Sequence, residues 1–203
     1  GTYTVTITDA NGCTASASAT ISGSGNVSVI AGSDQTICNG YAPSSLNASS
    51  GGVAGTYSWA DASNPLVILG TGSNFSPPPL TTTTTYTVTF TETNSGCTAT
   101  DIVTITVNPL PTVTASSNPA SPLCDGDLLT LTGGGAGITG AYTWDNGVIN
   151  NTPFTPGTGT VIYTVTGTDG NLCENTATIS VTVNPLPTAT IATSETACLN
   201  GLI

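Results

Sequence analysis

The six cysteines are the first candidates for chemistry, because this 203-residue sequence contains no lysine, arginine or histidine. Zinc sites favour cysteines only a few residues apart, whereas the closest cysteines here are 25 residues apart (38 − 13 = 25). Widely spaced cysteines without histidine are typical of disulfides in an oxidising, extracellular setting. The cysteine content therefore predicts an extracellular, cell-surface protein.

Repeated sequence contexts suggest how the cysteines pair. Cys38 and Cys124 each precede a leucine-containing strand, in Cys-Asn-Gly and Cys-Asp-Gly. Cys97 and Cys173 each follow a turn rich in asparagine and glycine, as Cys13 does. The simplest pairing is one bond within each similar stretch, Cys38–Cys97 and Cys124–Cys173. Cys13 and Cys198 are then expected to lack a partner within these residues.

The eleven acidic residues offer two further chemistries. Without histidine, lysine or arginine a serine or cysteine nucleophile has no partner base, so no catalytic residue and no enzyme is predicted. Oxygen ligands suit Ca²⁺, and Asp125 and Asp127, with Asp34 or Asp101, are candidate ligands at a junction between repeats. No dedicated calcium loop is present, so solvated carboxylates in turns are the favoured interpretation. No other cofactor is predicted.

The formal net charge of −11 excludes several partners. Nucleic-acid binding needs lysine or arginine to neutralise phosphates, and attraction to an anionic membrane surface needs the same cations. No stretch approaches the roughly 20 apolar residues of a membrane span. We therefore expect no nucleic-acid partner and no direct insertion into a membrane.

The element that organises the chain is a predicted β-hairpin from Tyr86 to Pro111. Apolar residues at 86, 88 and 90 alternate with threonines, which is the period of a strand with one buried face. Asn94-Ser95-Gly96 favours a tight turn because asparagine and glycine tolerate positive φ. Asn-Pro-Leu-Pro, from Asn108 onward, ends the second strand because proline has no N–H to donate.

This hairpin occurs three times, so the chain is predicted to be a tandem array. It recurs from Tyr163 to Pro187, and a third copy begins at Tyr3. Its two Asn-Pro-Leu-Pro motifs are 76 residues apart (184 − 108 = 76), the length of a small domain. The predicted segments are 1–23, the last hairpin of one repeat; 24–110 and 111–186, two complete repeats; and 187–203, the start of another.

Each complete repeat is predicted to be an immunoglobulin-like β-sandwich, which makes the fold class all-β. About seven short strands separated by turn signals are typical of that fold, and no helical pattern is present. Trp59 and Trp144 stand in matching Gly-x-Tyr-x-Trp strands. We expect both in the core; the alternative is that these aromatic residues are platforms for binding sugars.

The order of these motifs resembles the Ig-like and PKD-like repeats of giant surface proteins in Bacteroidota, which include gliding-motility adhesins exported by the type IX secretion system. Asn-Pro-Leu-Pro-Thr at 108–112 and 184–188 carries most of the resemblance, and Gly23-Ser24-Gly25 departs from it at the first junction. The resemblance implies a stalk or an adhesive filament, and it supplies no catalytic residue.

The sequence therefore predicts a structural segment of an extracellular adhesin or fibre, whose partners are neighbouring repeats or identical chains. Pro109 and Pro111 restrict φ and should stiffen one junction, whereas Gly23–Gly25 should bend more freely. Repeats arranged end to end are expected. Two alternatives are a glycan-binding module, with surface glycans as partners, and a filament subunit whose partial ends complete a neighbour by strand exchange.

Overall fold

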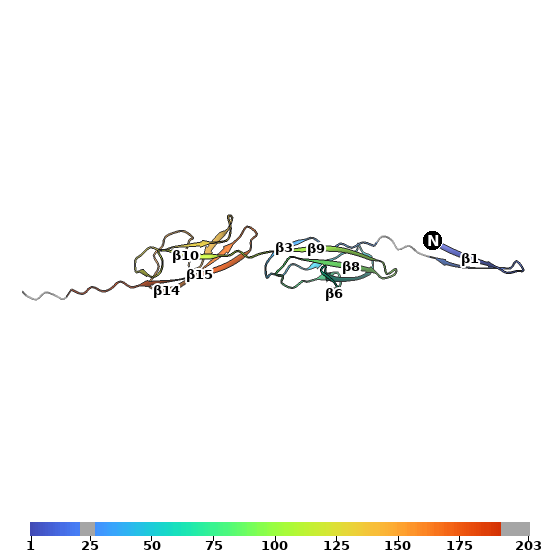
Figure 1. Cartoon of the computed structure of the whole chain (residues 1–203), viewed down its shortest axis with the longest axis horizontal. Coiled ribbons are helices and arrows are strands. Elements are labelled where there is room, and N and C mark those ends of the chain that lie inside the picture. Colours follow the sequence, from blue (N-terminus) through green and yellow to red (C-terminus); the bar gives the residue numbers. More distant parts are fainter. Residues whose placement is uncertain (21–26, 192–203) are drawn as a thin grey trace, which may run out of the picture. The chain divides into compact units, whose positions relative to one another are not determined.

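The computed structural model describes residues 1–20 and 27–191, and every regular element in these ranges is a β-strand. The chain divides into two compact units, Gly1–Pro109 and Leu110–Ile203 (Figure 1). The predicted flexible junction at Gly23–Gly25 and the cysteine at position 198 lie outside the described residues. Among the described residues, no helix is long and apolar enough to cross a membrane.

A β-sandwich occupies most of the first unit. Its strands are β3 (Gln35–Cys38), β4 (Leu46–Asn47), β5 (Gly55–Asp61), β6 (Asn64–Thr71), β7 (Asn74–Phe75), β8 (Thr84–Glu92) and β9 (Thr98–Asn108). One sheet has the order β3-β9-β8-β5-β6, and β4 pairs with β7 in a smaller sheet. An isolated bridge between Ile30 and Ser49 adds to the strand pairing of this unit.

The core of this sandwich follows from the alternation in β8. Tyr86, Val88 and Phe90 are buried and the residues between them are half-buried, as the period of two predicts. Trp59, on the neighbouring strand β5, is completely buried and stacks on Phe75 with ring centroids 5.8 Å apart. The apolar face of the main sheet therefore packs on β4 and β7 around one tryptophan.

The second unit contains a similar sandwich. Its strands are β10 (Thr114–Asn118), β11 (Leu123–Cys124), β12 (Thr130–Gly134), β13 (Ala141–Trp144), β14 (Gly159–Thr168) and β15 (Glu174–Asn184). One sheet has the order β11-β15-β14-β13, and β10 pairs with β12. Leu129 and Leu131 enter the core together with Trp144, Val165 and Val181. Each unit is thus an all-β, Ig-like sandwich, which confirms the predicted fold class.

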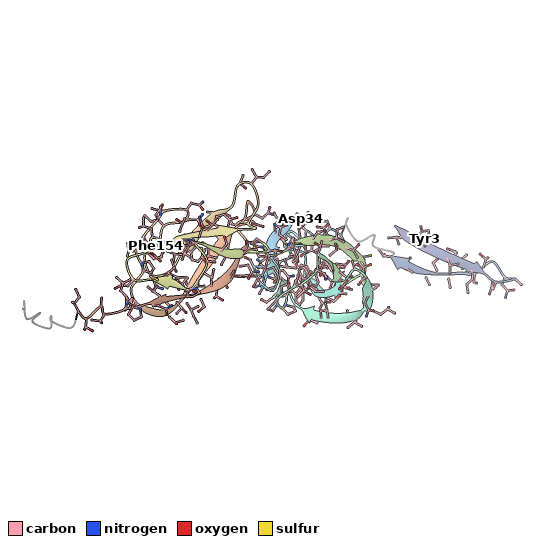
Figure 2. The ribbon with its side chains drawn as sticks, turned by 60° about the vertical axis from the view of Figure 1, so that its left-hand side comes forward. Tyr3, Asp34 and Phe154 are labelled. Atoms are coloured by element: carbon pink, nitrogen blue, oxygen red, sulfur yellow. The ribbon has the colours of Figure 1, made fainter. Side chains whose placement is uncertain are left out.

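The first twenty residues form a hairpin that is a sheet of its own, β1 (Thr2–Thr8) with β2 (Thr14–Thr20). Its apolar residues are exposed, Tyr3 by 66%, Val5 by 64% and Ile7 by 67% (Figure 2 labels Tyr3). The equivalent positions of β8 are core residues. The opposite face is polar, and cross-strand hydroxyl pairs such as Thr6 with Ser16, at 2.9 Å, connect the two strands.

Candidate functional site: the cysteines and carboxylates at the ends of each sandwich

In the first sandwich, β3 runs parallel to the end of the last strand, β9. Cys38 lies opposite Asn108, and the N–H of Asn39 donates to the Asn108 carbonyl at 2.9 Å. Before β3, Oδ1 of Asp34 accepts a hydrogen bond from the backbone N–H of Thr104 at 2.8 Å (Figure 2). A backbone ladder and a charged hydrogen bond therefore connect the first strand to the last. We call this parallel pairing the terminal clamp.

The second sandwich has its own terminal clamp. β11 runs parallel to the end of β15, with Leu123 opposite Val183 and Cys124 opposite Asn184. The N–H of Asp125 donates to the Asn184 carbonyl at 2.9 Å, at the position that Asn39 occupies in the first clamp. The same arrangement therefore ends both repeats, with a cysteine at the same place in each.

The predicted Cys38–Cys97 disulfide is wrong. Cys38 lies opposite Asn108, the last residue of β9, whereas Cys97 directly precedes the first residue, Thr98. β9 has 11 residues, and a strand rises about 3.3 Å per residue, so its ends are roughly 30 Å apart. Bonded cysteines have Cα atoms within about 7 Å. The parallel clamp places the two cysteines at opposite ends of one strand.

The predicted Cys124–Cys173 disulfide is wrong for the same reason. Cys124 lies opposite Asn184, the last residue of β15. Cys173 directly precedes the first residue of β15 and is 11 residues before Asn184 in the sequence. Cys124 is also a free, exposed thiol, as is Cys13. Cys38 and Cys173 are nevertheless each disulfide-bonded. The protein therefore contains disulfide-bonded cysteines, but they are not paired as the sequence suggested.

A carboxylate organises each hairpin turn that carries a cysteine. In the first hairpin, Oδ1 of Asp9 accepts from the backbone N–H groups of Asn11 and Cys13, both at 2.9 Å. Oδ1 of Asp169 makes the same two bonds in the second sandwich, and Cys173 donates at 2.9 Å. Sequence reasoning missed this role, although an aspartate four residues before a cysteine in two of the three turns signals it.

Glu92 fills this role in the first sandwich. Its side chain accepts from the Ser95 hydroxyl and from the backbone N–H groups of Asn94, at 2.9 Å, and Ser95, at 2.7 Å. These hydrogen bonds lower the pKa of Glu92 below its ordinary value because they favour the ionised form, and the bond from the Ser95 hydroxyl has the largest effect. Only 8% of Glu92 is exposed. The turn is therefore built around an ionised carboxylate.

Changing Glu92 to glutamine is expected to remove an acid-sensitive part of the stability. Because the pKa of Glu92 is lower in the folded state than in the unfolded chain, its contribution is present above the ordinary value of about 4.3 and disappears as pH falls through the lowered folded pKa. Urea unfolding at pH 7 and at about pH 3 tests this. The free-energy difference between wild type and Glu92→Gln should shrink at the acid pH; an equal difference at both would contradict it.

The candidate calcium ligands are divided between the two units. Asp34 and Asp101 belong to the first unit, and Asp125 and Asp127 to the second. Oδ2 of Asp127 accepts from the Cys124 N–H at 2.9 Å, which closes a turn after β11. Over residues 1–20 and 27–191, no three histidine, cysteine, aspartate or glutamate side chains form a group that could hold a metal ion. Asp34, Asp101 and Asp127 instead accept hydrogen bonds from backbone N–H groups.

Neither tryptophan offers a platform for sugars. Trp59 is 0% exposed and Trp144 is 8% exposed. Their indole N–H groups donate inside the fold, to the Gly72 carbonyl at 3.1 Å and to Oδ1 of Asn150 at 3.0 Å. The second unit also has an open hollow of about 290 Å³ beside Phe154, which Figure 2 labels. The expectation of core tryptophans is therefore confirmed.

Each unit has two sheets packed around a buried tryptophan, so the chain is a tandem array of Ig-like modules. Residues 26–109 match the family described as Ig-like domain, CHU_C associated. These residues coincide closely with the first predicted complete repeat. No curated protein sequence matches the chain.

Several solved structures of multi-domain proteins are similar to the chain. They include the fibronectin(III)-like modules of Clostridium thermocellum CbhA, with a TM-score of 0.38 and 9% identity over 81% of this chain and 99% of that chain. The eight N-terminal Ig domains of the Down Syndrome Cell Adhesion Molecule have a TM-score of 0.47 and 12% identity over 90% of this chain and 35% of that chain. Three domains of the bacteriophage RB49 Hoc protein have a TM-score of 0.38 and 15% identity, over 77% and 58%.

Proposed function

We propose that the chain is a structural segment of the stalk or filament of an extracellular adhesin, of the kind found in the giant surface proteins of Bacteroidota that its motifs resemble. Its partners would be neighbouring repeats and identical chains in a fibre. The observation that carries the proposal is the terminal clamp, present in both sandwiches. Two further observations support the proposal. Ig-like modules typically serve as non-enzymatic structural units. Cys38 and Cys173 are disulfide-bonded, as cysteines of extracellular proteins commonly are.

The clamp suits a module that is pulled from both ends. Because β3 is parallel to β9, the N-terminal end of β3 and the C-terminal end of β9 lie at opposite ends of the pairing. Tension on the two ends of the repeat therefore slides the strands past each other. All hydrogen bonds of the clamp must yield together, whereas in an antiparallel pair pulled open from one end they would yield one at a time. A stalk needs this resistance.

Asp34→Ala is expected to lower the force at which the first sandwich unfolds when the chain is stretched by its termini. The substitution removes the acceptor for the Thr104 N–H, a bond that joins the segment before β3 to β9 across 70 residues of sequence. Single-molecule force spectroscopy measures this force directly.

Asp61→Ala is the matched control. Oδ1 of Asp61 also accepts a backbone N–H, that of Ser63 at 2.8 Å, but this bond lies within one local turn. Its loss should leave the unfolding force unchanged even if it alters thermal stability. Equal unfolding forces in wild type, Asp34→Ala and Asp61→Ala would overturn the mechanical role.

A further inference from the structure

We propose that the outer edge of β6 (Asn64–Thr71) is an interaction surface, and that its partner is the β6 strand of a second copy of this chain. β6 is the last strand in the sheet order β3-β9-β8-β5-β6, so one of its edges faces no other strand of the described residues. Four consecutive aliphatic side chains of β6 are exposed. They are Leu66 at 91%, Val67 at 48%, Ile68 at 54% and Leu69 at 46%. An exposed aliphatic edge strand is a template for pairing with another strand.

The core of the first sandwich holds β6 in place. A Cβ on Gly70 would lie 2.7 Å from the ring of Phe75, so the strand runs directly against a core side chain. Trp59 lies opposite Gly70, and its indole N–H donates to the Gly72 carbonyl, just beyond β6, at 3.1 Å. A partner therefore meets an edge that is already ordered, and little conformational entropy is lost on binding.

The charge of the chain points to a second copy as the partner. The chain has 11 acidic residues and no lysine, arginine or histidine, so two copies repel each other wherever acidic surfaces meet. No acidic residue occurs between Asp61 and Glu92, and β6 lies in that interval. Two copies can therefore approach along β6 without opposing carboxylates. A basic partner would find no carboxylate on β6 to bind, whereas an identical strand matches it in length and in hydrophobicity.

The same charges favour an antiparallel arrangement of the two strands. Asp61 lies opposite Asn64, the first residue of β6. Antiparallel pairing places the two Asp61 carboxylates at opposite ends of the interface, whereas parallel pairing would place them side by side. Pro65 has no N–H to donate, so the new ladder is limited to the residues after it. The twofold axis then lies near Ile68, where each strand meets the same residues of its copy.

The interface is small, so we expect a weak association. The register of β6 on β5 shifts on both sides of Ala60, and such bulges, like Pro65, limit pairing at an edge. We expect a dissociation constant on the order of 100 µM, because so short a ladder buries less than the roughly 1,200 Å² of a standard interface. The chain is then a monomer at the low micromolar concentrations of optical unfolding experiments. Chains side by side in a fibre would repeat the contact and gain avidity; this step rests on the proposed stalk, and the pairing itself does not.

Sedimentation equilibrium of the whole chain tests the pairing at about 20–500 µM, a range that spans the expected dissociation constant. Exposed thiols are first alkylated with iodoacetamide, so that no intermolecular disulfide contributes. We expect a concentration-dependent dimer in the wild type. Ile68→Glu should weaken the dimer at least about tenfold, because it places two carboxylates close together beside the axis.

Ile102→Glu is the matched control for Ile68→Glu. Ile102 is 58% exposed, close to the value for Ile68, but it is on β9, which lies between β3 and β8 in the same sheet. The substitution adds the same charge away from the edge and should leave the dimer unchanged. Equal weakening by Ile68→Glu and Ile102→Glu would overturn the proposal.

Amide chemical shifts of the wild type over the same concentrations give a readout that needs no variant. They should change at residues 66–71 and stay constant at Ile102. Changes over β1 and β2 instead would mean that the second copy binds the first hairpin, and would overturn the proposal. A wild type that is still monomeric at about 500 µM would also overturn it, and would leave β6 for a strand of another protein. These experiments measure association in solution, whereas Asp34→Ala is tested on single molecules, so the two proposals can fail separately.

Discussion

Trp59→Ala is expected to cost the first sandwich about 3–5 kcal/mol of unfolding free energy. Trp59 is completely buried, stacks on Phe75 with an interplanar angle of 25°, and donates from Nε1 to the Gly72 carbonyl. Alanine removes the ring, leaves a cavity between the sheets and deprives that carbonyl of its donor. Because domains are stable by only about 5–15 kcal/mol, the loss is a large part of the total.

Urea unfolding measured by circular dichroism gives this value. Leu66→Ala is the control, since Leu66 is 91% exposed and its loss should change stability by no more than about 0.5 kcal/mol. If Trp59→Ala cost no more than Leu66→Ala, Trp59 would not be the centre of the core. Binding of a sugar by Trp59 would then become a hypothesis to test again.

Gly135→Ala is expected to destabilise the second sandwich by about 2–5 kcal/mol. The substitution would force alanine into a left-handed backbone conformation and would also create a steric clash. Gly135 has a φ of +90°, and a Cβ there would lie 1.8 Å from the backbone carbonyl oxygen of Thr112. A backbone atom cannot move aside as the end of a side chain can. The segment that leads into β10 would have to shift.

Gly137→Ala separates the two causes. Gly137 has a nearly identical φ of +86°, but a Cβ there meets no atom within 4 Å. The Gly137→Ala substitution should therefore cost only the free energy of the left-handed backbone conformation, about 1–2 kcal/mol. Urea unfolding followed by the fluorescence of the buried Trp144 compares the two variants. Equal losses would show that the close approach to Thr112 does not constrain this unit.

Local patterns in the sequence determined the strands and their buried faces. The alternation through Tyr86, Val88 and Phe90 specifies which side chains face the core, because the period of a strand is a local property. The Gly-x-Tyr-x-Trp motif likewise placed Trp59 and Trp144 inside. Two Asn-Pro-Leu-Pro motifs revealed the tandem array, since a repeated exit from a strand needs no knowledge of tertiary structure.

The tertiary structure alone decided what the cysteines and carboxylates do. Cys38 and Cys97 share a repeat, and nothing in their spacing shows that β3 pairs in parallel with the far end of β9. The same holds for Asp34, whose hydrogen bond to Thr104 spans 70 residues. Parallel pairing of the first and last strands is a long-range event, which hydrophobic periodicity does not encode. That pairing places Cys38 and Cys97, the two cysteines of the first repeat, at opposite ends of its last strand.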